Sequence, residues 1–315
     1  MMSNRVTYVS GQWVPETEAK VSIFDSALMF GDMAFEMTRT FNQVPFHLDD
    51  HLDRLYDSLD LLQISCGCSK DELHQLTLDT LQRNLPTEDA QMDWWLMHNI
   101  SRGPLPVYES AFPDGIKPTI TISAWPLITH TGSFAPTYES GIRLVVPEQQ
   151  AIPEELLDVK AKTRSRQHYR IAQNQVEARG QGLWALLVDP DGFVTEGTGC
   201  NVFVVKDRQL RTPEPRNILK GVSRKVTLQL ADKLGIPAEQ TNLTVDDLMT
   251  ADEIFCTASS FCLVHAIAFE GKELPVAPGP IFQQLVKAWK EYVGLDFVQQ
   301  AQDYHQALES WKDGG

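Results

Sequence analysis

Leucines recur at helical spacing in one stretch of the first half of the chain. They occupy positions 48, 52, 55, 59 and 62 within "HLDDHLDRLYDSLDLL". Spacings of four and three residues place side chains on one face of an α-helix, which turns once in about 3.6 residues. We therefore predict a helix here that buries a single leucine stripe.

The rest of the first half alternates between strand and helix patterns. "RVTYVSGQWV" is typical of a strand, and "AFEMTRTFNQVPF" has β-rich runs on either side of "FNQ", which predicts a hairpin. "KDELHQLTLDTLQRNL" predicts a second helix, whereas "MDWWLMHNIS" and "KPTITISAWPL" predict strands. Residues 128–141, "ITHTGSFAPTYESG", are rich in Ser, Thr, Gly and Pro and carry no period. We expect an interdomain loop there.

The second half repeats this alternation. The strand "IRLVVPE" comes first, and "LWALLVDPDGFVTEGTGCNVFVV" contains two apolar runs about a "DPDG" turn, a hairpin signal. "LKGVSRKVTLQLADKLGI" enters a helix through a glycine-containing turn. "ADEIFCTASSFCLVHAIAFEGKEL" predicts strands around a turn of small residues, and "PIFQQLVKAWKEYV" predicts a late helix.

These elements predict a mixed fold of class α/β (α+β) with two domains. At 315 residues and 43% hydrophobic content, the chain is large enough to build two cores. We place a small α/β domain at residues 1–127, the loop at 128–141 and a large domain at 142–315.

Charge and hydropathy exclude several classes of function. The 27 Lys and Arg residues face 42 Asp and Glu residues, for a net charge of -15. Such a chain has little long-range attraction for nucleic acid or anionic membranes. It contains neither a long apolar run nor an N-terminal secretory pattern, so we expect a cytoplasmic protein without membrane contact.

The cysteines do not indicate a disulfide framework. Their count is odd and they form no paired CxxC motifs: Cys66, Cys68, Cys200, Cys256 and Cys262. We interpret them as reduced thiols and expect no metal site.

One short segment gathers cations in this acidic chain. "DVKAKTRSRQHYR", residues 158–170, contains Lys160, Lys162, Arg164, Arg166 and Arg170. A solvated helix face or a basic patch for nucleic acid would explain most such runs. The remaining motifs must decide between these readings and a chemical role.

Three loops carry candidate chemistry. The turn "KGVS" precedes a helix whose first N–H groups and dipole favour an anion such as phosphate, although many helices begin this way merely to be capped. The turn "TASS" places the hydroxyls of Thr257, Ser259 and Ser260 close together, as an ordinary capped turn also would. Glu196 ends an apolar strand, where burial would be costly without a partner such as an arginine.

Six strings in the same order give the sequence a family resemblance. They are "SIFDSALMFGDMAFE", "HLDRLYDSL", "KTRSRQHY", "VTEGTGCNVFVV", "LKGVSR" and "TASS". Together they resemble the fold-type IV pyridoxal-phosphate enzymes, the class IV aminotransferases. This family includes branched-chain aminotransferases, D-amino-acid transaminases and aminodeoxychorismate lyases.

The resemblance implies a pyridoxal 5'-phosphate site. Lys162 would be the Schiff-base lysine, with Lys160 as its competitor two residues away, and Glu196 would face the pyridine nitrogen. The implied phosphate contacts are Arg54, Val222, Ser223 and Ser259. Neighbouring cations and partial burial both favour the neutral amine that a Schiff base needs. One lysine of the basic segment would then take part in the reaction.

The substrate side departs from the family pattern. The Arg-x-His carboxylate trap of D-amino-acid transaminases is missing from "RGPLPVYESAFP", and Trp95 and Met97 stand where branched-chain enzymes present Tyr and Arg. Phe30 replaces the usual Tyr before "GD". Phe30, Phe35 and Trp95 would line an apolar pocket or belong to the core. Arg39 and Arg102 are candidates either for binding the substrate carboxylate or for structural salt bridges.

The resemblance predicts a ping-pong aminotransferase acting on an amino acid, branched-chain-like or otherwise apolar, and a 2-oxo acid. An aminodeoxychorismate-lyase-type elimination and a D-amino-acid transaminase are alternatives, as is a protein that holds the cofactor without catalysis. It also implies at least a homodimer. The loop "RGPLPVYESAFP" with Tyr108 would close the substrate side of a neighbouring subunit's site, although such loops are more often plain surface.

Overall fold

The computed structural model describes residues 4–88 and 90–313. Its residue contacts divide the chain into two compact units. The first unit contains the chain up to Leu127 together with Ala161–Ser165, and the second contains Ile128–Lys160 and the chain from Arg166 onward. The sequence placed residues 161–165 in the second domain, whereas their contacts group them with the first unit. That the units fold as independent domains stays a prediction.

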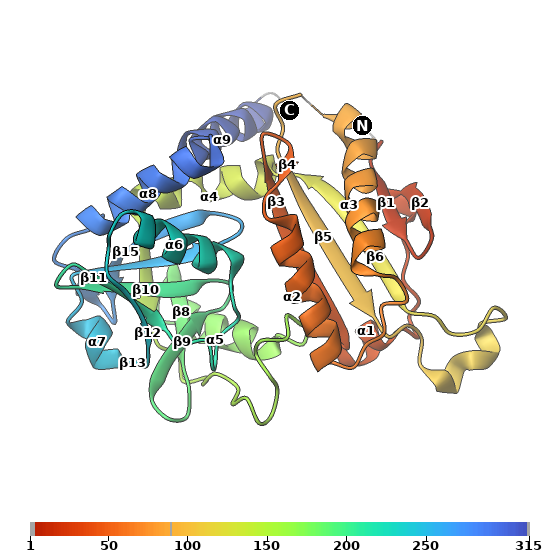
Figure 1. Cartoon of the computed structure of the whole chain (residues 1–315), viewed down its shortest axis with the longest axis horizontal. Helices are drawn as coiled ribbons and strands as arrows, with labels where there is room; N and C mark the ends of the chain where they lie inside the picture. The colour runs from red at the N-terminus through yellow and green to blue at the C-terminus, as the bar shows by residue number, and fades with distance from the viewer. Residues whose placement is uncertain (1–3, 89, 314–315) are drawn as a thin grey trace. The chain divides into compact units, whose positions relative to one another are not determined.

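The first unit is built on an antiparallel sheet with the strand order β2-β1-β6-β5-β3-β4 (Figure 1). Its strands are β1 (Val6–Val9), β2 (Gln12–Pro15), β3 (Met33–Phe41), β4 (Val44–Pro45), β5 (Trp94–Ser101) and β6 (Thr119–Pro126). Its α-helices are α1 (Ser26–Phe30), α2 (Leu48–Leu61) and α3 (Lys70–Asn84), and its 3-10 turns are η1 (Glu16–Glu18), η2 (Leu85–Thr87) and η3 (Pro106–Ala111). The predicted hairpin about "FNQ" is confirmed as the β3–β4 pair.

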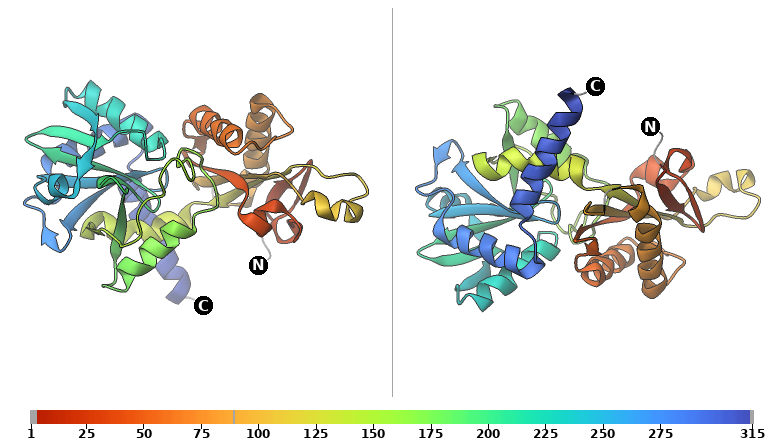
Figure 2. Two further views of the ribbon diagram at one scale, coloured as in Figure 1. Left: turned by 90° about the horizontal axis from the view of Figure 1, so that it is seen from below. Right: turned by 90° about the horizontal axis from the view of Figure 1, so that it is seen from above.

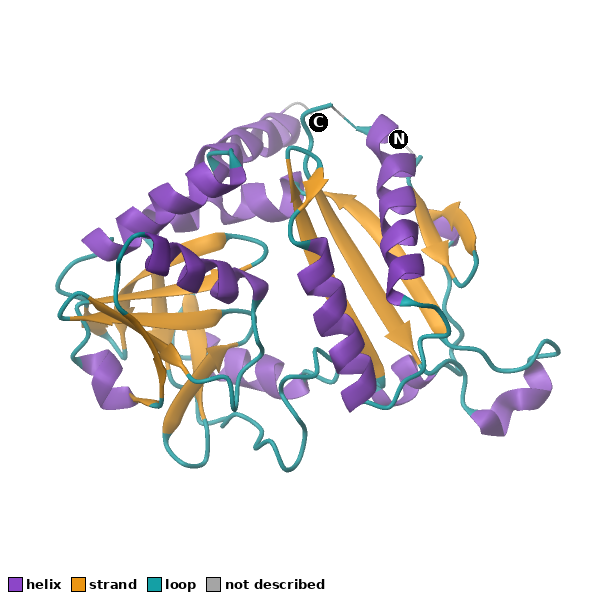
Figure 3. Ribbon diagram, viewed as in Figure 1, coloured by secondary structure: helices purple, strands orange, loops and turns teal. Residues whose placement is uncertain are grey.

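Helices α2 and α3 pack on one face of this sheet (Figure 3). Leu48, Leu52, Leu55 and Leu59 are buried against it, which confirms the leucine stripe. Leu62 lies one residue beyond the end of α2 and is partly buried.

Alternation along β3 and β5 gives the sheet two different faces. Ala34 and Glu36 point toward α2. Phe35 lies opposite Asn99 in the strand register, and Met37 lies opposite Met97. Because neighbouring side chains on a strand point to opposite faces, Phe35, Met37, Trp95, Met97 and Asn99 share the face that α2 and α3 do not cover. We call this the Phe35 face.

The second unit contains a mixed sheet whose strand order is β12-β11-β10-β14-β15-β7-β8-β9-β13. Its strands are β7 (Ile142–Val145), β8 (Leu183–Val188), β9 (Phe193–Gly197), β10 (Asn201–Lys206), β11 (Gln209–Pro213), β12 (Ala238–Thr241), β13 (Leu243–Thr244), β14 (Glu253–Ala258), β15 (Cys262–Phe269) and β16 (Lys272–Glu273). Its helices are α4 (Ile128–Ser140), α5 (Gln167–Glu177), α6 (Val222–Lys233), α7 (Val245–Met249), α8 (Pro280–Val293) and α9 (Phe297–Asp313). The β8–β9 pair confirms the predicted hairpin about "DPDG".

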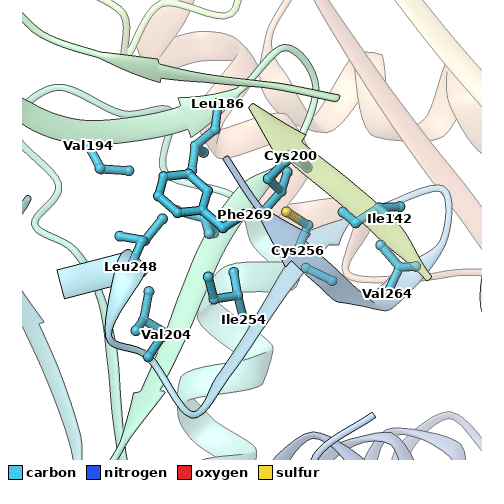
Figure 4. Packing of buried hydrophobic residues seen from close by; sticks show 14 of the residues in the cluster. Ile142, Leu186, Val194, Cys200, Val204, Leu248, Ile254, Cys256, Val264 and Phe269 are labelled. Atoms are coloured by element: carbon cyan, nitrogen blue, oxygen red, sulfur yellow. The ribbon is translucent and has the colours of Figure 1, made fainter. Parts of the chain in front are cut away.

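A further pairing closes this sheet on itself. Strand β9 pairs with β8 and also with β10, through Glu196 and Asn201. The strands enclose a core in which Ile142 of β7, Ile254 of β14 and Val264 of β15 converge with Phe269 (Figure 4). Glu196 therefore lies where the sheet closes.

The expected loop at residues 128–141 is wrong, because Ile128–Ser140 form α4. Its buried residues are Ile128, Thr131, Gly132 and Ala135, spaced as on one face of a helix. This face packs on α9, and the two helices lie side by side (Figure 2). Tertiary packing thus stabilises a helix despite Pro136 and a run of poor helix formers.

No helix in the described part of the chain is both long enough and apolar enough to cross a membrane.

Candidate active site

Lys162 lies on a short extended segment that pairs with β3 inside the first unit. The Phe35 N–H donates to the Lys162 carbonyl oxygen at 2.9 Å, and the Arg164 N–H donates to the Met33 carbonyl oxygen at 3.0 Å. Ala34 and Thr163 form an antiparallel bridge between these two bonds. The segment therefore adds a further extended stretch beside β3, with a defined register for Lys162.

Helix α2 fixes the same segment from the other side. The Ser58 hydroxyl accepts a hydrogen bond from the Lys162 N–H at 3.0 Å and donates to the Arg54 carbonyl oxygen at 2.7 Å. Ser58 and Arg54 lie one helical turn apart, so one turn of α2 positions both the Lys162 backbone and the Arg54 side chain.

The Lys162 side chain extends over an aromatic ring. Its Nζ atom lies 4.7 Å from the centre of the Phe35 ring, and the Arg164 guanidinium carbon lies 3.8 Å from the same centre. Cations at such distances interact favourably with the ring electrons. Lys162 and Arg164 therefore lie together at the Phe35 face.

Lys160 has different surroundings in the second unit. Its ammonium group forms an ion pair with Glu154 and a longer one with Asp158. The hydrogen bond that the Lys160 ammonium donates to the Glu154 carboxylate is the main cause that raises the pKa of Lys160. Lys160 is therefore held as a protonated cation, which is a poor nucleophile.

Arg54 belongs to a buried ionic network on the helix-covered face of the sheet. Its Nε and Nη2 atoms donate to the Glu36 carboxylate at 2.8 and 2.7 Å, and His51 Nδ1 lies 3.1 Å from the same carboxylate. Burial raises the pKa of Glu36, but Arg54 and His51 outweigh burial and hold that pKa well below its usual value. Arg54 is thus positioned by Glu36, and its predicted contact with a phosphate stays a prediction.

Glu196 is buried at the closure of the second sheet and accepts three hydrogen bonds. The donors are the Tyr169 hydroxyl at 2.6 Å, the Asn201 amide at 3.2 Å and the Leu219 N–H at 3.0 Å. Burial is the main cause that raises the pKa of Tyr169 well above its usual value, with the Glu196 charge second. These donors stabilise an ionised Glu196 in an apolar setting.

Strand register brings the other second-unit candidates close to Glu196. Asn201 pairs with Glu196 on one side and with Thr257 on the other, so the three residues form a row across β9, β10 and β14. Asn201 also donates to the Leu219 carbonyl oxygen at 3.0 Å, just before the Gly221 entry of α6. The helix entry and the "TASS" turn therefore lie at the same end of this sheet.

Two observations test whether this end fits a phosphate group. Helix α6 begins at Gly221 without a side-chain cap, so the N–H groups of Val222 and Ser223 at its first turn are oriented outward along the helix axis. The Thr257 hydroxyl is buried and has no hydrogen-bond partner among the described residues. Backbone donors and an unsatisfied hydroxyl suit a phosphate. Ser259 follows in the turn after β14 and is partly buried.

The predicted substrate residues divide into two groups. The Phe35 face carries Phe35, Trp95 and Met97 together with Lys162. Phe35 is only 2% exposed, which also fits a residue of the core. Phe30 is 69% exposed at the end of α1. Tyr108 of η3 stacks on Phe24, with ring centres 4.4 Å apart.

The two arginines considered for the substrate carboxylate have structural contacts. Arg39 is buried, lies over Phe41 and donates from Nε to the Thr40 carbonyl oxygen. Arg102 pairs with Asp32 and donates to the carbonyl oxygens of Leu62 and Gln63. These contacts favour the salt-bridge reading for Arg102 and a packing role for Arg39.

Sequence reasoning missed four residues of these clusters. Glu36 and His51 hold Arg54, while Tyr169 and Asn201 hold Glu196. Glu36 had a detectable signal, because a carboxylate on the apolar face of a strand needs a cation nearby. Tyr169 lies within the basic segment, where the cations alone drew interpretation.

Most of the chain is similar in sequence to known aminotransferases. The family model for amino-transferase class IV matches residues 33–268. A protein of Methanocaldococcus jannaschii with the provisional name branched-chain-amino-acid aminotransferase is 35% identical over 266 residues, which cover 84% of this chain and 88% of that protein. The D-alanine aminotransferase of Bacillus licheniformis is 27% identical over 281 residues, covering 89% and 94%.

A solved structure extends the match to the fold. The branched-chain aminotransferase of Thermoproteus uzoniensis, crystallised with norvaline, superposes with a TM-score of 0.79 at 25% identity and covers 95% of this chain and 97% of that one. The chain therefore belongs to the class IV aminotransferase family, and the predicted fold-type IV architecture is confirmed. As a family member it is a pyridoxal-phosphate-dependent transaminase.

Proposed function

We propose that this enzyme transfers the amino group of an amino acid with a branched or otherwise apolar side chain to a 2-oxo acid, by a ping-pong mechanism at Lys162. The observation that carries the proposal is the Lys162 amine over Phe35, on a sheet face that also bears Trp95 and Met97. An apolar substrate side chain gains free energy by leaving water for such surroundings. Relatives named branched-chain aminotransferases support the same substrate class.

Each residue has a defined task in the proposed reaction. Lys162 would bind the cofactor aldehyde until the substrate amine displaces it, and its freed amine would then move a proton from the substrate Cα to the cofactor side. Pyridoxal phosphate, when bound, supplies an electron sink for the pair released at Cα. Glu196 would hold a proton on the pyridine nitrogen, and Tyr169 and Asn201 orient its carboxylate by donating hydrogen bonds to it.

The phosphate contacts complete the proposal. The N–H groups of Val222 and Ser223 at the start of α6 would bind the phosphate, with the hydroxyls of Thr257 and Ser259 beside them. Arg54, oriented by Glu36, would add positive charge. A helix N-terminus and an arginine are each favourable to a doubly charged anion.

Borohydride reduction of the holoenzyme followed by peptide mapping tests the covalent link. The pyridoxyl group should be found on Lys162, and Lys160→Met should not change the yield because Lys160 is tied to Glu154. Label on Lys160, or on no lysine, would overturn the assignment.

A substrate panel tests the reaction itself. Apolar L-amino acids should convert the bound cofactor to its amino form and release the matching 2-oxo acid. Conversion by D-amino acids instead would favour the D-alanine aminotransferase relatives. Release of pyruvate from aminodeoxychorismate would indicate the lyase, and binding without conversion would indicate a non-catalytic protein.

Assembly and location are part of the same proposal. We expect at least a homodimer, supported by a group of exposed apolar residues in the first unit: Val21, Ile23, Leu28, Met29, Phe30 and Val107. Large apolar patches on a surface favour association. A cytoplasmic location is supported by the cysteines, all five of which are free thiols.

A further inference from the structure

Two thiols lie in contact in the connection between α2 and α3. The sulfur atoms of Cys66 and Cys68 are 3.3 Å apart, and both residues are reduced in the structure. Gly67 between them is exposed and has a φ of 77°, a left-handed conformation that glycine adopts at little cost. The turn at Gly67 brings the two side chains together.

The connection that carries the two thiols is fixed on both sides. Arg102 donates to two carbonyl oxygens just after the end of α2, and Ser69 caps the start of α3. The Tyr56 hydroxyl of α2 donates to the Cys68 carbonyl oxygen at 2.8 Å. These contacts hold the segment in the shape that places the sulfur atoms side by side.

The contact between the thiols makes the pair easier to ionise than one thiol alone. The hydrogen bond from the Cys68 thiol is the main cause that lowers the pKa of Cys66 to about 6, although burial acts in the opposite direction. The same bond raises the pKa of Cys68, which keeps its proton. A thiolate, rather than a thiol, is the form of cysteine that oxidants attack.

Access and ligand number favour oxidation over metal binding at this pair. Cys66 is 6% exposed, and Cys68 is partly buried beside the exposed Gly67, so only a small oxidant has access. Over the described residues, no group of three or more Cys, His, Asp or Glu side chains is arranged to hold a metal ion.

We propose that Cys66 and Cys68 form a redox-active dithiol, which hydrogen peroxide converts to a disulfide within the chain. The Cys66 thiolate attacks one peroxide oxygen, the O–O bond breaks, and the leaving hydroxide takes up a proton to become water. The Cys68 sulfur then attacks the Cys66 sulfenic acid, and its proton leaves with the hydroxyl group as a second water. The dithiol loses two electrons and two protons, and the peroxide gains them.

The position of the pair predicts a reversible bond. Only Gly67 separates the two cysteines, so the disulfide would close a very short loop and add little stability. A dithiol reductant such as dithiothreitol should therefore restore both thiols by thiol–disulfide exchange. This chemistry needs no pyridoxal phosphate and does not depend on the proposed function.

Oxidation of the wild-type holoenzyme at about pH 7 tests the proposal. A small excess of hydrogen peroxide should remove two of the five thiols that a thiol reagent titrates in denaturant, and dithiothreitol should restore them. Peptide mapping should find the disulfide between Cys66 and Cys68. The buried Cys200, Cys256 and Cys262 are internal controls. A disulfide that includes one of these three or joins two chains, or no loss of thiols, would overturn the proposal.

Two single variants separate the roles of the cysteines. Cys68→Ser keeps a hydrogen-bond donor but leaves no thiol to condense with, so dimedone should trap a sulfenic acid on Cys66. In Cys66→Ser, Cys68 should be oxidised about 10-fold more slowly, because an ordinary thiol is little ionised at neutral pH. Ser65→Ala, an exposed change in the same connection, is the matched control and should behave as wild type. Equal rates at the two cysteines, or no trapping on Cys66, would contradict the assignment.

Discussion

At the scale of single residues, hydrogen bonds offset the cost of burying the Glu196 carboxylate. A buried carboxylate is costly in an apolar setting, and three donors from α5, β10 and the chain before α6 offset that cost. The sequence could indicate Glu196 because its neighbours are apolar, but it could not identify Tyr169, whose hydroxyl reaches Glu196 only after α5 packs beside β8.

Changing Glu196 to Gln tests the proposed role of its negative charge. Glu196→Gln keeps the size of the side chain but cannot sustain a proton on the pyridine nitrogen, so breaking of the substrate Cα–H bond should slow severely while cofactor binding stays largely intact. Rapid mixing with an α-deuterated donor measures the step. Glu177→Gln, an exposed change on α5, is the control. Single-turnover rates equal to wild type would refute the role.

At the scale of elements, the patterns that predicted correctly were those with large apolar residues. The leucine stripe identified α2, and alternating or apolar runs identified both hairpins. Helix α4 has the same spacing of buried positions, but two of them are Thr131 and Gly132 and the helix contains Pro136. The amino-acid composition of α4 therefore obscures its helical period. Small residues are favourable at these buried positions only because α9 packs against them.

That contact makes Gly132 sensitive to an added methyl group. A Cβ at Gly132 would lie 2.8 Å from Leu308 Cδ1 and 2.9 Å from the Tyr304 backbone carbon, so the helices would have to separate. Gly132→Ala gains up to about 1 kcal/mol in helix propensity, but overpacking costs about 1–3 kcal/mol. We expect a net fall in the free energy of unfolding by urea, whereas Ser133→Ala, on the exposed side of α4, should not destabilise. Greater stability of Gly132→Ala would show that the helices adjust freely.

The contact between β5 and α3 predicts a pH dependence. His98 is fully buried, and its Nε2 atom bonds the Thr77 hydroxyl at 2.7 Å. Burial lowers the pKa of His98 to about 4 from 6.5, so the unfolded chain binds more protons between these values. Stability present above about pH 6.5 should be lost progressively as the pH falls toward 4, by about 3 kcal/mol at most.

His98→Gln keeps a partner for Thr77 but does not titrate. Between about pH 7 and pH 4.5 the variant should lose less free energy of unfolding than wild type, measured in urea. Comparing the two proteins cancels other groups that titrate in this range, such as His51, whose pKa burial also lowers. Parallel losses in both proteins would show that His98 does not contribute.

At the scale of the whole molecule, the contacts of the Lys162 segment could not be predicted from local sequence patterns. Residues 161–165 follow the first stretch of the second unit, yet their hydrogen bonds run to β3 and α2 of the first. Pairing between distant segments has no local pattern, because an edge strand and a solvent-exposed extended loop have similar sequences. The family motif identified Lys162, but its neighbours Phe35 and Ser58 required the fold.

The exposed apolar residues of the first unit lead to the prediction about assembly. Ile23, Leu28 and Phe30 are each at least 67% exposed, and Val107 of η3 is 78% exposed. The stretch that contains Ile23, Leu28 and Phe30 lies beside the stretch that contains Val107. The Leu105 N–H donates to the Phe24 carbonyl oxygen at 3.0 Å, and Asp25 forms an antiparallel β-bridge with Pro104. Single exposed apolar residues are ordinary, but a joined group is typical of a subunit interface.

Replacing one of these residues by a charge should therefore separate the subunits. Wild type should sediment at low micromolar concentration as a particle of at least two chains, and Leu28→Asp should shift it to one, because an unpaired charge in an apolar interface costs several kcal/mol. Leu234→Asp is the matched control, since Leu234 is 43% exposed in the second unit. A one-chain particle for wild type would rule out the dimer, and a dimer that survives Leu28→Asp but not Leu234→Asp would place the interface on the second unit.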